Sequence, residues 1–333
     1  MKLQAIGKGS DAEAALFLAA NRLFHGLYPY TQLDYLGNFP SAAPGLVLLM
    51  APFTMTKTFP LLIPFLVIVS AVIIKKISYT SSKANLYLLF LLSSPAFLQS
   101  MIQANDYLIT GLLFSLLAVG LFYYWDKSRW GNALLIVLAG FLGCSRLNFF
   151  YFPLLLGFFL TRRNVKSAVT FAIPALMITL LLHAGFYWWD PHAYSPMQVA
   201  TKQYSGTILY RFDTLFILVS ASIAVAIITM IRVKNSLESW LFYLWLCLAT
   251  PLIIGGVFFM MKSNWTLQSG MGLGYITLTA PILIMSLCLS VGKKIISAQI
   301  GMVEMSLAYP AQKNPDFYRS IARQQGCRCV SQY

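Results

Sequence analysis

An all-α, polytopic membrane protein is predicted by three features of this chain. Of its 333 residues, 58% are hydrophobic and only 10% are charged, a balance that a water-soluble domain of this length cannot hide in one core. The apolar residues come in runs near the ~17–25 residues that cross a bilayer. The net charge of +14 comes from short basic clusters between these runs. Such spacing marks membrane topology and argues against a nucleic-acid partner.

Seven of the apolar runs are long enough to be transmembrane helices. Two shorter runs, 132–143 and 147–160, are separated only by Cys144, Ser145 and Arg146, and they form a pair of short helices or one broken hairpin. Counted as two, they give about nine transmembrane helices. The seven long runs are 59–74, 84–102, 107–125, 167–188, 211–231, 238–261 and 271–291.

Lys and Arg residues in the short loops set the orientation, because they remain on the cytoplasmic side of a membrane. Five short loops carry 12 of the 24 Lys and Arg residues and few acidic residues, and placing all five inside makes every span alternate correctly. These cytoplasmic residues are Lys75, Lys76, Lys83, Lys127, Arg129, Arg162, Arg163, Lys166, Arg232, Lys234, Lys293 and Lys294. The segments then predicted outside are 1–58, 103–106, 144–146, 189–210 and 262–270.

The first outer segment contains two predicted helices that do not cross the membrane. Residues 10–27 form an amphipathic helix, and the apolar segment 41–56 forms an interfacial helix, since counting it as a crossing would invert every later loop. The chain thus divides into an external loop (1–58), a transmembrane bundle (59–294) and a polar cytoplasmic tail (295–333). An external start with no span before it predicts that a first transmembrane helix is missing from this chain.

Two charged residues stand out at the predicted outer ends of the spans. Asp106 lies between two apolar runs, at a predicted membrane boundary. A carboxylate in such a position is a functional-site candidate unless water simply hydrates it. Arg146 lies in a loop too short to reach far into water. Its guanidinium can bind a phosphate bidentately, or it can extend to lipid headgroups.

Other outer residues have a functional and a structural interpretation. Asp11 is a functional carboxylate or a helix-start residue that the helix dipole stabilises. Lys202 and Arg211 meet an anionic ligand or anchor headgroups. His192, in the same outer loop as Lys202, binds a ligand or is an ordinary surface histidine. The five cysteines are dispersed and give no disulfide framework.

Several of these features, in this order and spacing, resemble the GT-C superfamily of membrane glycosyltransferases over residues 10–160. Gln103-Ala104-Asn105-Asp106 resembles the second external loop of that superfamily, and the short helices around Arg146 continue the likeness. In that superfamily an acidic residue of the first external loop follows the first transmembrane helix, so the resemblance also implies that one helix is absent here. The residues resembling the first external loop are Asp11, Phe17, Ala20, Leu23, Gly26, Tyr28-Pro29-Tyr30 and Phe39-Pro40.

The resemblance implies a mannosyltransferase-like enzyme that moves a sugar from a polyprenyl-phosphate donor to a lipid or glycan acceptor at the outer or lumenal face. Asp11 matches the catalytic base of that superfamily. Asp106 matches an acid that orients the acceptor or, in metal-using members, binds a divalent cation. No metal ligand is assigned, because the sequence has no clear Asp-x-Asp pair and hard cations need several oxygen ligands.

Chemistry of this kind also needs cations for the departing phosphate and polar groups for the sugars. The donor-phosphate candidates are Arg146, Lys202 and Arg211. The substrate-binding candidates are Asn105, Tyr28, Tyr30 and His192. The expected partners are the polyprenyl-phosphate sugar, its acceptor and membrane lipids, in a bacterial plasma membrane or, second, in the endoplasmic reticulum.

Two other functions are alternatives to the enzyme. A transporter or flippase of a lipid-linked glycan would show charged or unwound segments near the midplane and some repeat symmetry. The seven long apolar runs carry no central Asp, Glu, Lys or Arg, which favours the enzyme. A membrane scaffold subunit, or an enzyme made inactive by truncation, is the third reading.

Overall fold

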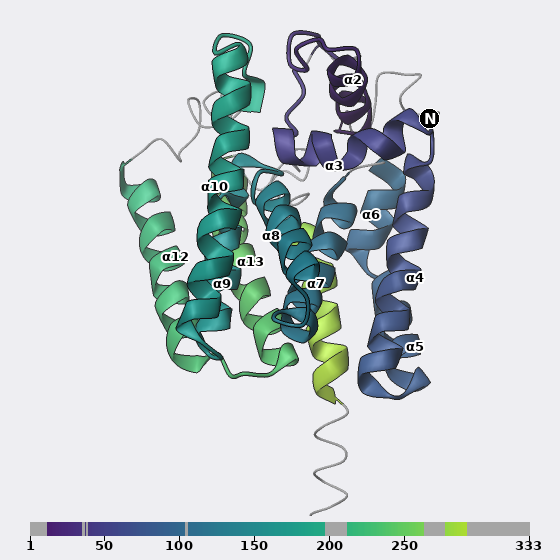
Figure 1. The fold of residues 1–333 in the computed structure, drawn as a ribbon, viewed down its shortest axis with the longest axis vertical. Helices are drawn as coiled ribbons and strands as arrows, with labels where there is room; N and C mark the ends of the chain where they lie inside the picture. Colours follow the sequence, from purple (N-terminus) through teal and green to yellow (C-terminus); the bar gives the residue numbers. More distant parts are fainter. Residues whose placement is uncertain are drawn as a thin grey trace, which may run out of the picture. The chain divides into compact units, whose positions relative to one another are not determined.

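The computed structural model describes residues 12–34, 37, 39–103, 106–196, 212–262 and 277–291, and every regular element in these ranges is a helix. The chain forms two units, Met1–Leu289 and Ser290–Tyr333, and the helices discussed below belong to the first (Figure 1). The prediction of an all-α fold is therefore confirmed for the described residues.

Four helices are long and apolar enough to cross a membrane. They are α4 (Phe59–Ser78), α7 (Tyr107–Tyr124), α10 (Val165–Trp189) and α13 (Leu237–Lys262). The larger count of about nine spans stays a prediction. In the described ranges three other apolar helices are shorter, namely α8 (Arg129–Gly143), α9 (Phe152–Thr161) and the helix Thr277–Val291, and in α12 (Phe212–Arg232) the candidate apolar stretch is only Ser220–Arg232.

The predicted span at 84–102 is not one continuous helix, because this run is two helices, α5 (Ser81–Leu92) and α6 (Pro95–Gln103). Ser93 and Ser94 separate them, and their hydroxyls donate to the carbonyls of Leu89 and Leu91 at 2.6 and 2.7 Å. Serine hydroxyls compete in this way with helical hydrogen bonds. Pro95 then disfavours a helical conformation at the residue before it and starts the next helix.

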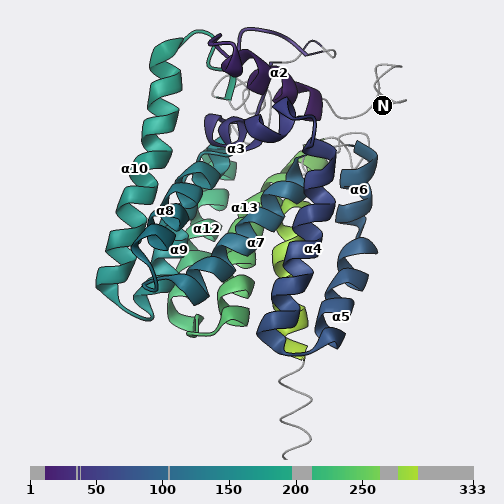
Figure 2. The ribbon, with the colours of Figure 1, turned by 45° about the vertical axis from the view of Figure 1, so that its right-hand side comes forward.

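Two helices from the first part of the chain, α2 (Ala12–Phe24) and α3 (Pro44–Met55), lie across one end of the unit (Figures 1 and 2). This is the end where α7 begins and α10 finishes, and we call it the capped end. The turns that join α4 to α5, α7 to α8, α9 to α10 and α12 to α13 lie at the opposite end. Four of the five basic loops assigned to the cytoplasm thus share one end, as the topology requires, and the fifth, with Lys293 and Lys294, lies outside the described residues.

Glycines allow the closest approaches between helices. An added Cβ at Gly111 of α7 would lie 1.9 Å from the backbone oxygen of Leu278. An added Cβ at Gly143, where α8 ends, would lie 2.6 Å from Thr179 Oγ1 of α10 and 2.9 Å from Pro153 of α9. Small residues at such crossings are typical of membrane helix packing.

Substituting Gly111 tests this packing. Gly111→Ala is expected to lower the free energy of unfolding by about 1–3 kcal/mol, because the methyl group meets backbone and not a movable side chain. Gly185→Ala is the matched control, since a Cβ at Gly185 of α10 meets nothing within 4 Å. It should be neutral or stabilise by up to about 1 kcal/mol. The free energy of unfolding of both variants is measured in detergent. Equal losses of stability in Gly111→Ala and Gly185→Ala would contradict the close approach of α7 to Leu278.

Candidate functional site

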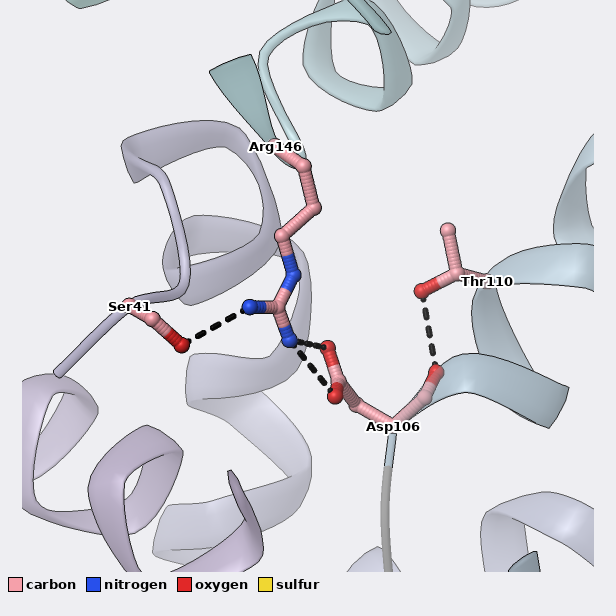
Figure 3. Close-up of polar contacts among 4 residues, drawn as sticks. All are labelled: Ser41, Asp106, Thr110 and Arg146. Carbon is pink, nitrogen blue, oxygen red and sulfur yellow. Dashed lines mark hydrogen bonds and ion pairs between the residues drawn. The ribbon is translucent and has the colours of Figure 1, made fainter. Parts of the chain in front are cut away.

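A buried ion pair between Asp106 and Arg146 is the main charged feature of the capped end (Figure 3). Nη2 of Arg146 donates to both carboxylate oxygens of Asp106 at 2.8 Å. Nη1 of the same guanidinium donates to Oγ of Ser41 at 2.8 Å. The two charged side chains are only 6% and 1% exposed. This burial argues against two alternatives raised by the sequence. The Arg146 side chain does not extend to lipid headgroups, and the Asp106 carboxylate is not simply hydrated.

Asp106 is held by the start of α7. It is the residue immediately before the helix, and its carbonyl oxygen accepts hydrogen bonds from the Thr110 backbone N–H at 3.0 Å and from the Thr110 hydroxyl at 2.9 Å. Asp at this position commonly caps the helix with its carboxylate, but here no side-chain cap forms. The carboxylate is instead directed to Arg146.

Arg146 is held between α8 and α9, where a short 3-10 helix, η1 (Leu147–Phe149), begins. Its carbonyl oxygen accepts from the backbone N–H of Phe149 at 3.0 Å. Its guanidinium lies 5.4 Å from the ring centre of Tyr107, which adds a cation–π attraction. The cation therefore contacts α7 through both Asp106 and Tyr107.

Ser41 reaches the pair because the segment before α3 is docked on the end of α8. The backbone N–H of Ala43 donates to the Ser145 carbonyl at 3.1 Å, and that of Gly45 donates to the Cys144 carbonyl at 2.9 Å. A Cβ at Gly45 would lie 2.0 Å from the Phe141 carbonyl oxygen, so only glycine permits this approach. Three segments far apart in the sequence thus meet at the ion pair.

A cluster of buried tyrosines fastens the loop between α2 and α3 to the end of α10. The Tyr28 hydroxyl donates to the carbonyls of Phe186 and Asp190 at 2.9 and 3.1 Å, and the Tyr30 hydroxyl donates to the Ala42 carbonyl at 3.0 Å. Tyr194 packs edge-on against Tyr30, with ring centres 5.6 Å apart. Burial raises the pKa of all three phenols, so they remain protonated donors.

The structure thus brings together only part of the predicted site. Asp106 and Arg146 form an ion pair. Tyr28 and Tyr30 belong to a separate cluster, and their hydroxyls donate hydrogen bonds to backbone carbonyls. Contacts of these tyrosines with substrate stay a prediction. His192 is exposed, and its backbone N–H donates to Asp190 Oδ1 at 3.1 Å. The candidates outside the described residues are Asp11, Asn105, Lys202 and Arg211.

Two residues of the capped end were missed by the sequence analysis. Ser41 directly follows Phe39 and Pro40, which were noted only for their resemblance to the first external loop of the GT-C superfamily. Tyr194 had no signal of its own, because an aromatic residue in a polar loop is common. Among the described residues, no group of three or more His, Cys, Asp or Glu side chains is arranged to hold a metal ion.

Comparisons with known proteins found no protein-family model, no curated protein and no solved structure that matches this chain. We therefore infer its function from the sequence and from the geometry of the capped end.

Removing one partner of the ion pair tests whether its charges are truly sealed from water. Arg146→Met is expected to destabilise the protein by about 3–5 kcal/mol, because it leaves a buried carboxylate uncompensated. The double variant Arg146→Met with Asp106→Leu should recover most of this loss. Arg129→Met, at an exposed arginine, is the control and should change stability by less than about 0.5 kcal/mol. Unfolding measurements that find the double variant as unstable as the single one would argue against a buried charge.

Proposed function

We propose that this protein is a membrane glycosyltransferase that moves a sugar from a polyprenyl-phosphate donor to a lipid or glycan acceptor at the outer, periplasmic or lumenal, face of the membrane. One observation carries the proposal: the buried Asp106–Arg146 pair, which is bound by Ser41 of the external loop. Ser41, Asp106 and Arg146 come from, or directly follow, the three segments in which the sequence resembles the GT-C superfamily. The pair also lies at the end of the unit that is opposite the basic turns.

The proposed reaction exchanges one bond at the anomeric carbon of the sugar for another. The bond to the donor phosphate oxygen breaks, and a bond to the acceptor oxygen forms. The acceptor proton passes to a carboxylate, for which we propose Asp11, and the phosphate leaves with the bonding electron pair. Arg146, with Lys202 and Arg211, is proposed to stabilise the charge on that phosphate.

Both terminal nitrogens of Arg146 are already hydrogen-bonded in this structure, so a phosphate that binds these two nitrogens must replace a partner. A guanidinium binds two phosphate oxygens best with two of its nitrogens, and here these nitrogens serve Ser41 and Asp106. We propose that the donor phosphate takes the place of Asp106 on Arg146, and that the released carboxylate accepts a hydrogen bond from the acceptor hydroxyl. Asp106 then orients the acceptor only when the donor is bound.

The distribution of charge along the helices supports an enzyme over a transporter. In α4, α7, α10 and α13, Asp, Glu, Lys and Arg occur only in the first and last turns. Ionisable residues on a transport pathway usually lie deeper in the membrane. The buried charges of this protein are instead gathered beneath the external loop.

The base is tested by Asp11→Asn in the purified full-length protein. Transfer from a panel of polyprenyl-phosphate sugars is expected to fall at least ~100-fold, which is the scale of a lost general base. Asp190→Asn is the matched control. The Asp190 side chain accepts backbone hydrogen bonds from His192 and Ala193, which an amide oxygen also accepts. An unchanged turnover number in Asp11→Asn would remove Asp11 from this role.

The phosphate role of Arg146 is tested by Arg146→Lys, which keeps the charge beside Asp106 but lacks the planar fork. We expect the KM for the donor to rise roughly tenfold or more, the scale of a lost hydrogen bond to a charged group. The KM for the acceptor should change far less. Equal increases for both substrates would point to a purely structural pair.

A further inference from the structure

Three turns at the end of the unit opposite the capped end bring cationic side chains together. They are the turns that join α7 to α8, α9 to α10 and α12 to α13 (Figure 1). We call their cations the basic cluster. The acidic residues in the same turns are Asp126 and, at the start of α13, Glu238. The basic cluster consists of Lys127, Arg129, Arg162, Arg163, Lys166, Arg232 and Lys234.

Contacts between arginines and the neighbouring turn join two of these segments into one surface. Arg162 donates from its guanidinium to the Met230 carbonyl, and Nε of Arg163 donates to Asn235 Oδ1 at 3.2 Å. The guanidinium of Arg163 also lies over the rings of Phe122 and Trp240, with centres 4.2 and 5.2 Å away.

The third turn is fixed to the same surface through a carboxylate. The Ser167 hydroxyl donates to Asp126 Oδ2 at 3.0 Å, which ties the turn after α7 to the start of α10. Trp125 packs edge-on against Phe171 with ring centres 5.4 Å apart. The seven cations therefore belong to a connected surface and not to three independent loops.

Much of the positive charge on this surface is uncompensated. The side chains of Arg129, Lys166, Arg232 and Lys234 are exposed and have no hydrogen-bond or ion-pair partner within the described residues. These four residues can bind an external anion without breaking any described contact.

Large apolar side chains are exposed directly beside these cations. Trp130 follows Arg129, Val165 precedes Lys166, and Ile231 precedes Arg232; they are 87%, 65% and 71% exposed. Neighbouring apolar and basic side chains suit the headgroup region, where the apolar groups enter the acyl layer and the cations meet phosphates. A soluble acidic partner would leave the apolar groups in water.

We propose that the basic cluster binds the phosphate groups of anionic phospholipids in the adjoining leaflet, and that the bound lipid bridges the three turns. A basic residue near an anionic membrane surface contributes about 1 kcal/mol, roughly fivefold in affinity. The bound lipid should therefore stabilise the helix ends that these turns connect. This site is independent of sugar transfer, since it lies at the other end of the unit.

The test uses the full chain in nanodiscs of phosphatidylglycerol or of phosphatidylcholine, with lipid retention measured by native mass spectrometry and stability by thermal unfolding. Lys166→Gln with Lys234→Gln is the test variant. Lys75→Gln with Lys76→Gln, in the last turn of α4, removes equal charge from another turn at the same end. We expect the test variant to lose at least about tenfold in phosphatidylglycerol affinity, and the control to stay within about twofold.

The proposal also requires that phosphatidylglycerol raise the thermal stability of the unsubstituted protein, less so at high salt. Three results would overturn it. The first is equal retention of both lipids, and the second is an equal loss in both double variants, which would mean diffuse attraction to the leaflet. The third is tighter binding of a soluble polyanion such as heparin through Lys166 and Lys234, which would identify a soluble partner.

Discussion

The capped end depends on one interaction, the buried salt bridge from Arg146 to Asp106. Neither charge reaches water, so each needs the other, and separating them would expose the protein to the full desolvation penalty. Because Asp106 precedes α7 and Arg146 follows α8, the pair fixes the starts of two helical segments relative to each other. Ser41 joins the segment before α3 to the same arrangement. The guanidinium of Arg146 therefore links three segments: the one before α3, the start of α7 and the one after α8.

The loop that supplies Ser41 is held by neutral contacts. Tyr28 and Tyr30 donate to backbone carbonyls of α10, of its C-terminal cap and of the loop itself, and Ala43 and Gly45 donate to the end of α8. Each such hydrogen bond is worth only about 1 kcal/mol, less than the charge pair it covers. Several modest contacts are easier to break than the ion pair, so the proposed donor phosphate would gain access to Arg146 most readily by displacing this loop.

Sequence reasoning identified Asp106 and Arg146 separately, because a charge beside an apolar run is unusual, but it did not pair them. Pairing depends on how loops 40 residues apart meet, and hydropathy carries no such distance information. The break at Ser93-Ser94-Pro95 was predictable from local chemistry. It was missed because the prediction relied on the apolar run around these residues. Tyr194 could not have been found, since its importance comes from the rings it contacts.

The two ends of the unit treat positive charge in opposite ways. At the capped end, Arg146 has its counter-charge within the protein, and our proposal has the donor phosphate bind there by exchange with Asp106. At the basic end, Lys166, Arg232 and Lys234 have no counter-charge in the described structure and face the surface. An internal counter-ion makes binding selective, because a weak anion cannot displace it. Exposed cations without one attract any anion held nearby, and in a membrane the anion with the highest local concentration is the lipid phosphate.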